Sequence, residues 1–221
     1  MAPVSDGQAA AKTAWTALTE PWRACLEEAW ASWTAGSLGI GAVAVDGHGA
    51  IVSRGRNRIL EQPTQAGVLA GTFLAHAEMN ALAVIPFGQT RGLTIYTSLE
   101  PCLMCAATMV MVNIGHVFYA APDPLFEGIH DALGAHSFCA GRLPVPEGPL
   151  PGPVGMFARI LPLTVPAFWD KTNDALEAHR RLAPSVVARA DEIGAGGRLS
   201  AVATAGGEVR EAMGSIWDHL G

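Results

Sequence analysis

The sequence predicts an α/β fold in which a sheet carries helices on both faces, followed by a helical C-terminal extension. Short runs rich in Val, Ile and Ala alternate with helical segments over the first 140 residues, and strands that alternate with helices form sheets covered on both sides. Half of the 221 residues are hydrophobic and only 15% are charged, which is enough for a sizeable core. We therefore expect one domain over residues 1–140, with a proline-rich segment and a helical extension over residues 141–221 packed on it.

The first regular element is expected to begin near residue 20. Residues 1–11 are small and polar, and we expect them to be disordered. Apolar side chains then recur at three- and four-residue spacing, which is one face of an amphipathic helix: Trp22, Cys25, Leu26, Ala29, Trp30 and Trp33. Thr19 can cap this helix and Gly36 can end it. The tryptophans are therefore expected in the core.

Two strand-like runs follow, Gly39–Val45 and Ala50–Arg56, with Asp46-Gly47 between them. An Asp-Gly pair between two such runs is typical of a β-hairpin. Arginines stand at alternating positions where the second run ends, at Arg54, Arg56 and Arg58. Alternating residues share one face of a strand. We interpret these arginines as a solvated strand face, with a phosphate-binding patch as the alternative.

The middle of the chain continues the alternation. We expect a helix over His76–Ile85, a strand over Leu93–Thr97, a helix that opens at Pro101 and a strand over Val117–Ala120. The stretch 102–122 has no formally charged residue and is long enough to imitate a membrane span. The run Asn113-Ile114-Gly115-His116 stops a helix in its middle, so a buried helix followed by a buried strand fits better.

The C-terminal part changes in character. From Gly141 to Pro166 there are seven prolines, and we expect an extended segment poor in regular structure. Helices are expected over Trp169–Ala183 and roughly Ala201–Leu220, separated by Gly194–Gly197.

Charge and cysteine content narrow the classes of function. The formal net charge is −6, and neither residues 1–166 nor residues 167–221 are basic. Because affinity for nucleic acid comes largely from basic groups, general nucleic-acid binding is not expected. The sequence has four cysteines and two of them belong to one motif, so a disulfide framework is not expected. The N-terminus does not read as a signal peptide, so we expect a cytoplasmic protein without a membrane span.

Two short motifs carry the chemistry: His76-Ala77-Glu78 and Pro101-Cys102-Leu103-Met104-Cys105. An imidazole and two thiolates are ligands that zinc accepts, and three protein ligands leave the fourth position open for water. Proline at a helix start places both cysteines in the first turn, where unpaired amides favour thiolates, and the i,i+3 spacing puts them on one side. Glu78 can meet His76 only if the histidine lies at the mouth of its helix. A carboxylate there can move protons.

A lone Cys-x-x-Cys motif leaves other roles open. A zinc ribbon needs a second cysteine pair, which the sequence lacks, and no thioredoxin-like layout follows Pro101. The combination His-x-Glu with Pro-Cys-x-x-Cys is the signature of zinc nucleobase deaminases.

The run Thr97-Ser98-Leu99-Glu100-Pro101-Cys102-Leu103-Met104-Cys105-Ala106, together with His76-Ala77-Glu78, resembles the cytidine deaminase-like superfamily. The likeness is closest to the branch that contains tRNA adenosine deaminases and bacterial guanine deaminases, and it covers roughly residues 20–135. It implies a three-layer α/β/α sandwich with a central mixed sheet, commonly as a homodimer. It also implies one zinc ion per chain on His76, Cys102 and Cys105, with Glu78 as the catalytic proton shuttle and Asn57 as a substrate ligand. The segment between Asn57 and His76 is longer than this branch leads us to expect, and the part beyond about residue 140 has no counterpart.

We therefore expect zinc-dependent hydrolytic deamination of a free nucleobase or nucleoside of the guanine, cytosine or adenine type, because the acidic charge favours a small substrate. The first alternative is a tRNA-specific adenosine deaminase, and the second is a non-catalytic zinc-stabilised interaction module. Ala77 and Glu100 are further candidates for substrate contacts. Phe126 and Trp169 are candidates for stacking on a base, with core packing as the alternative.

Overall fold

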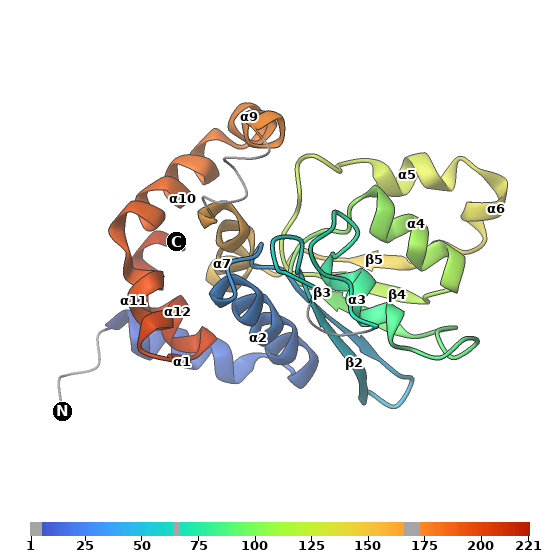
Figure 1. Ribbon diagram of the computed structural model, residues 1–221, viewed down its shortest axis with the longest axis horizontal. Helices are drawn as coiled ribbons and strands as arrows, with labels where there is room; N and C mark the ends of the chain where they lie inside the picture. The colour runs from blue at the N-terminus through green and yellow to red at the C-terminus, as the bar shows by residue number, and fades with distance from the viewer. Residues whose placement is uncertain (1–5, 64–66, 166–172) are drawn as a thin grey trace.

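A five-stranded mixed sheet forms one half of the protein, and helices from both ends of the chain form the other (Figure 1). The computed structural model describes residues 6–63, 67–165 and 173–221. The strand order is β2-β1-β3-β4-β5. The strands are β1 (Gly41–Val45), β2 (Ile51–Arg56), β3 (Thr94–Thr97), β4 (His116–Tyr119) and β5 (Val145–Glu147). Strand β1 is antiparallel to β2 and β3, whereas β3, β4 and β5 are parallel, which confirms the mixed sheet and the hairpin.

Helices cover both faces of the sheet, as the sequence predicts. Helix α2 (Glu20–Thr34) packs on one face, where a Cβ added to Gly41 would lie 2.2 Å from the Cys25 carbonyl oxygen. Helix α3 (Ala77–Ala83) packs on the other, where a Cβ on Gly55 would lie 2.3 Å from the Ala77 carbonyl oxygen. Backbone approach this close is possible only at glycine. Helix α4 (Leu103–Val112) lies on the same face as α3, and its residue Met109 shares a buried cluster with Leu82 of α3 and Ile95 of β3.

The C-terminal helices form an arc on the far side of α2 (Figure 1). They are α7 (Gly152–Ile160), the 3₁₀ helix η1 (Leu161–Thr164), α9 (Asn173–Leu182), α10 (Pro184–Gly196), α11 (Arg198–Thr204), α12 (Val209–Ser215) and η2 (Trp217–His219). Phe157 and Ile216 belong to the same buried cluster as Leu26 of α2. The indole N–H of Trp30 donates to the Gly207 carbonyl at 2.9 Å, and that of Trp33 donates to Thr164 Oγ1 at 2.9 Å. Trp30 and Trp33 of α2 therefore face the extension, whereas the ring of Trp22 packs edge-on against Tyr96 of β3.

The structure corrects the prediction of disorder for residues 6–11, while residues 1–5 lie outside the described ranges. Residues 6–17 form helix α1 (Asp6–Ala17). Ala11 is fully buried in the cluster that contains Met213 of α12, and the Gln8 side chain donates to the Glu211 carbonyl at 3.2 Å. The composition is small and polar, but contacts with the far end of the chain hold the helix in place.

The proline-rich segment is also more regular than predicted, because its prolines lie where a missing N–H is tolerated. Pro146 lies in β5, which is an edge strand, and Pro153 lies in the first turn of α7. Short helices α5 (Ile129–Gly134) and α6 (Ser137–Ala140) precede it. The sheet takes its last strand from beyond residue 140, and the domain boundary proposed there stays a prediction.

One expected C-terminal helix is divided in the structure, whereas the break expected before it is confirmed. The helix expected over Ala201–Leu220 is divided into α11, α12 and η2, with Gly206 in the left-handed region at φ 71° between the first two. The expected break at Gly194–Gly197 falls at the end of α10, whose last residue is Gly196.

The uncharged stretch 102–122 is a helix followed by a strand, as the sequence predicts. Asn113 ends α4 in the left-handed region at φ 59°, and β4 follows. Within the described ranges, none of the helices combines the length and apolar character that a membrane crossing requires.

Candidate active site

Three metal-type side chains meet at the starts of α3 and α4. His76 is the N-cap of α3 and Cys102 the N-cap of α4, while Cys105 lies in the first turn of α4. His76 Nδ1 lies 3.6 Å from the Sγ atoms of both Cys102 and Cys105, and the ligand atoms all lie within 4.8 Å of one another. Tetrahedral zinc, with bonds of 2.0–2.3 Å to nitrogen and sulfur, separates two such ligands by about 3.6 Å. The donor set and its spacing therefore fit one zinc ion.

The electrostatics of the cluster favour metal binding. The hydrogen bond from Cys105 and the imidazole of His76 together lower the pKa of Cys102 to about 4, against the opposing effect of burial. The same hydrogen bond, together with burial, raises the pKa of Cys105 well above its ordinary value. Without metal, the pair therefore shares a proton. A metal binds the thiolate form, so its binding releases this proton.

Glu78 lies beside the cluster in the first turn of α3. Its side chain is only 4% exposed, Thr97 Oγ1 at the end of β3 donates to its Oε1 at 3.1 Å, and the Cys105 thiol donates to its Oε2 at 3.4 Å. Burial raises the pKa of this carboxyl group. His76 does lie at the mouth of its helix, which is the condition that brings Glu78 next to the ligands.

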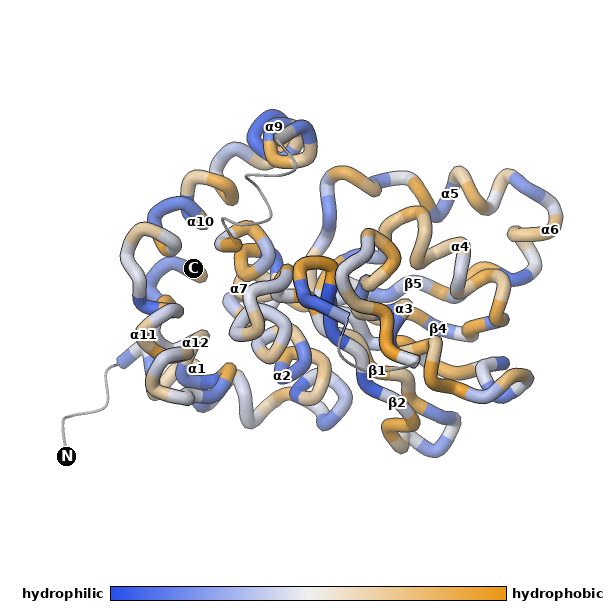
Figure 2. Tube along the Cα trace, in the orientation of Figure 1, coloured by the Kyte–Doolittle hydropathy of each residue, from blue (hydrophilic) through white to orange (hydrophobic). Residues whose placement is uncertain are grey.

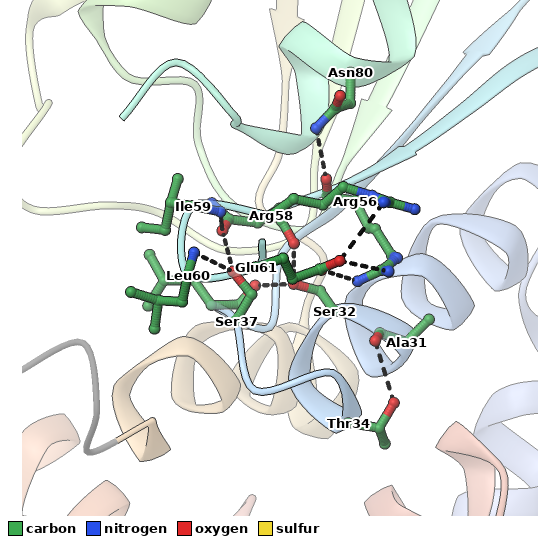
Figure 3. A network of polar contacts seen from close by, with 12 residues as sticks. Ala31, Ser32, Thr34, Ser37, Arg56, Arg58, Ile59, Leu60, Glu61 and Asn80 are labelled. Atoms are coloured by element: carbon green, nitrogen blue, oxygen red, sulfur yellow. Dashed lines mark hydrogen bonds and ion pairs between the residues drawn. The ribbon is translucent and has the colours of Figure 1, made fainter. Parts of the chain in front are cut away.

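Asn57 follows β2 and is fully buried. Its Oδ1 accepts hydrogen bonds from Ser37 Oγ at 2.8 Å and from the Ile59 N–H at 3.2 Å, and the Ser32 hydroxyl donates to its backbone carbonyl at 2.7 Å. Figure 3 labels the three donor residues, Ser32, Ser37 and Ile59. Among the described residues, Asn57 Nδ2 is the only buried side-chain nitrogen or oxygen without a hydrogen-bond partner. An unpaired buried donor is costly, which points to a ligand as its partner.

These groups line one cavity of about 190 Å³. Drug-sized ligands need pockets of about 300–1,000 Å³, so this volume suits a single ring system. The predicted site residues that line it are Asn57, His76, Ala77, Glu78, Glu100, Cys102 and Phe126. Cys105 lies behind them and is fully buried. Trp169 lies outside the described residues, so its predicted role stays a prediction. Glu100 accepts a hydrogen bond from the Asp123 N–H at 3.1 Å, which anchors the loop after β4.

The sequence did not point to three charged or polar residues that also line the cavity: Asp123, Arg159 and His179. Burial raises the pKa of Asp123 to about 6, and its Oδ1 lies 4.0 Å from His179 Nε2 on α9. Arg159 and His179 come from the C-terminal part, where no sequence signal links a single arginine or histidine to a metal cluster more than 50 residues away.

The alternating arginines do not form an open phosphate-binding patch. Arg54 pairs with Glu27 at 3.2 Å. Arg56 binds the Glu61 carboxylate with two nitrogens, and Arg58 lies 3.5 Å from the same carboxylate (Figure 3). The arginines are thus paired rather than merely solvated, and their acidic partners offset their charge.

Comparisons with known proteins agree with this geometry. The family model for the cytidine and deoxycytidylate deaminase zinc-binding region matches residues 17–121. The tRNA-specific adenosine deaminase of Bacillus subtilis is 36% identical over 93 residues, which are 40% of this chain and 52% of that protein. The corresponding protein of Aquifex aeolicus is 30% identical over 113 residues, which are 48% of this chain and 68% of that protein. The matches therefore span about half to two thirds of the relatives' length.

A solved structure from a study of A-to-I editing by tRNA:A34 deaminases is also similar. It superposes with a TM-score of 0.50 at 27% identity, and the match covers 60% of this chain and 94% of that chain. The part of the chain that the family model leaves out contains α7, α9 and α10, which supply walls of the cavity.

Proposed function

This chain belongs to the cytidine deaminase-like superfamily of zinc-dependent hydrolytic deaminases, and within it we propose that the substrate is adenosine in a tRNA. The observation that carries the deaminase chemistry is the buried carboxylate of Glu78 beside a His/Cys/Cys cluster, at a cavity that fits one base. The relatives support adenosine in tRNA better than the free base that we expected from the acidic net charge.

In the proposed reaction, water adds to the ring carbon that bears the amine, the C–N bond breaks, and ammonia leaves. When bound, zinc supplies Lewis-acid chemistry that makes water nucleophilic near neutral pH. The Glu78 carboxylate accepts the two protons of the attacking water one after the other, and it passes one to the ring nitrogen and the other to the departing amine. Thr97 holds the carboxylate in position through its hydrogen bond. Asn57 Nδ2 donates to an acceptor on the base, and the enclosing side chains exclude bulk water.

A free aminated nucleobase or nucleoside is the second candidate. The observation that favours it is the composition of the cavity wall, because Ala175 and His179 of α9 and Val186 of α10 line the site along with residues of the deaminase region. A site partly enclosed by helices suits a small diffusible molecule. The paired state of Arg54, Arg56 and Arg58 favours it too.

Ammonia release by the zinc-replete protein separates these candidates. The substrates are unmodified tRNA, and guanine, cytosine and adenine with their nucleosides, and inosine formation in the tRNA is read by sequencing. Turnover of tRNA alone supports the proposal, whereas turnover of one free compound without inosine in tRNA supports the second candidate. If the protein binds one zinc per chain but turns over none of these substrates, both candidate functions are contradicted and a non-catalytic zinc module is favoured. Glu78→Ala is the control for contaminating deaminases.

We also propose that the chain forms a homodimer through the outward face of α4. Figure 2 shows this helix without a hydrophilic stretch, and Leu103 and Met111 are 49% and 66% exposed. With Ala107 between them they stand at i, i+4 and i+8, which is one side of a helix. An apolar surface of this kind suits an isologous contact with a second copy. The cytoplasmic location stays a prediction.

A further inference from the structure

Arg159 holds an unusual position in the wall of the cavity. It lies in the last turn of α7, in the part of the chain beyond residues 17–121 that the family model matches. Among the described residues that line the cavity, it is the only arginine or lysine. Its side chain is half-buried, and the neighbouring wall residues Pro162 and Leu163 are apolar.

Among the described arginines that are not exposed, Arg159 is the only one with neither a hydrogen bond nor an ion pair. Arg54, Arg56, Arg58 and Arg198 each pair with a carboxylate at 3.5 Å or less. In the parts of the chain that the structure describes, the Arg159 guanidinium forms neither a hydrogen bond nor an ion pair. Its charge nevertheless reaches the cavity. Burial lowers the pKa of His179 and the Arg159 charge lowers it further, whereas at Asp123 the same charge opposes the rise in pKa that burial causes.

A guanidinium in this position needs an anionic partner. Arginine stays protonated at every physiological pH, so it cannot lose its charge to relieve the cost of partial burial. Two internal roles compete with ligand binding. The cation complements the dipole at the C-terminal end of α7, and Asp123 could serve as its partner. Asp123, however, lies beyond ion-pair distance, and its Oδ1 accepts the Leu125 N–H at 2.9 Å.

We propose that Arg159 binds a phosphate group of the nucleotide whose base enters the cavity. This inference rests on the proposed function, since the base and the phosphate belong to one molecule. A guanidinium offers two parallel N–H groups that match two phosphate oxygens. The phosphate has two possible sources, a free nucleoside monophosphate or the backbone of a tRNA, and both present the same chemistry to Arg159.

Binding measured without turnover tests the proposal. The zinc-replete Glu78→Gln protein is titrated calorimetrically with adenosine, 5′-AMP, 3′-AMP and an anticodon stem-loop, and again with Arg159→Ala or Arg159→Lys added. We expect at least one phosphate-bearing ligand to bind about 10- to 100-fold more tightly than adenosine, as a charged hydrogen bond of 1.5–3 kcal/mol gives. Arg159→Ala should remove this preference and leave adenosine binding within about twofold, and Arg159→Lys should restore part of it. Arg181→Ala, at an exposed position on α9, makes the same charge change and should retain the preference.

The outcomes separate this inference from the proposed function. An equal affinity for adenosine and every phosphate-bearing ligand, or a preference that persists in Arg159→Ala, would overturn the phosphate site. If Arg159 acted only on the helix dipole, Arg159→Ala would lower the melting temperature and weaken the binding of all ligands alike. This result would also count against the phosphate site. The phosphate is assigned to RNA if the protein prefers the stem-loop and Arg159→Ala reduces the slope of log affinity against log salt concentration by about one. Failure of deamination with the phosphate preference intact would instead refute the proposed reaction.

Discussion

Asn57 offers the sharpest separation between a substrate contact and a structural role. We predict that Asn57→Ala lowers both stability and activity, whereas Ser37→Ala lowers stability alone. Both changes break the buried hydrogen bond of 2.8 Å between Ser37 Oγ and Asn57 Oδ1, and neither residue is exposed. Ser37 does not line the cavity, and only Asn57→Ala removes the unpaired Nδ2 donor.

The magnitudes follow from the number of partners that lose their bonds. Asn57→Ala leaves the Ser37 hydroxyl and the Ile59 N–H without their acceptor. Ser37→Ala removes the acceptor of the Leu60 N–H and leaves Asn57 Oδ1 with only the Ile59 N–H as donor. Because an unsatisfied buried group costs about 1–3 kcal/mol, both variants should lose a few kcal/mol of unfolding free energy. The hydrogen bond from Nδ2 to the substrate should add a further loss of about tenfold in kcat/KM, and only in Asn57→Ala.

The assay combines urea unfolding, zinc content and kcat/KM on the substrate that the wild-type protein deaminates. Both variants should keep one zinc per chain, because neither residue contacts the ligand cluster. If Ser37→Ala lost as much kcat/KM as Asn57→Ala at equal zinc content, Asn57 would act only as scaffold, and our reasoning on its unpaired donor would be wrong.

Three further predictions concern the metal, the oligomer and pH. Cys105→Ser should lower zinc content, measured by mass spectrometry, well below one per chain, whereas the buried Cys25→Ser should retain it; equal loss in both would point to unfolding. Met111→Glu should convert a dimer to a monomer in light scattering, whereas Val52→Glu, at a similarly exposed apolar position, should not; an unchanged mass would exclude the α4 face. Burial raises the pKa of Asp123 to about 6 in the folded state, so between about pH 4 and pH 6 the folded protein holds a proton on Asp123 that the unfolded chain has lost. The unfolding free energy should therefore fall by up to about 3 kcal/mol as pH rises from about 4 to about 6. Asp123→Asn should lack this decrease, and a wild-type profile parallel to that of the variant would contradict it.

The features that sequence predicted well depend on neighbours along the chain. The hairpin at Asp46-Gly47, the helix mouth at His76 and the start of α4 at Pro101 follow from turn and capping chemistry within a few residues. The metal cluster also follows, since the Cys-x-x-Cys spacing fixes two ligands on one helical turn. These local signals were enough to predict a sheet with helices on both faces, and the family resemblance added that the sheet is mixed.

The features that sequence missed depend on contacts between distant segments. Helix α1 is held by α12, which lies about 200 residues further along the chain. The arginines at the end of β2 find acidic partners on α2 and in the loop after β2, Glu27 and Glu61, which alternation along a strand cannot reveal. Arg159 and His179 reach the cavity only because the extension folds back over it. Composition carries no information about which of many basic side chains will do so.

The central claim is that Glu78 moves protons in a zinc-dependent deamination, and Glu78→Gln tests it most directly. The amide keeps the size of the side chain and its acceptor for Thr97, but it cannot take a proton from water. Ammonia release from tRNA and from free bases should fall by a factor of about 10²–10⁴, the usual contribution of general acid–base catalysis, while one zinc per chain remains bound. Undiminished ammonia release by a zinc-replete Glu78→Gln protein would contradict the account.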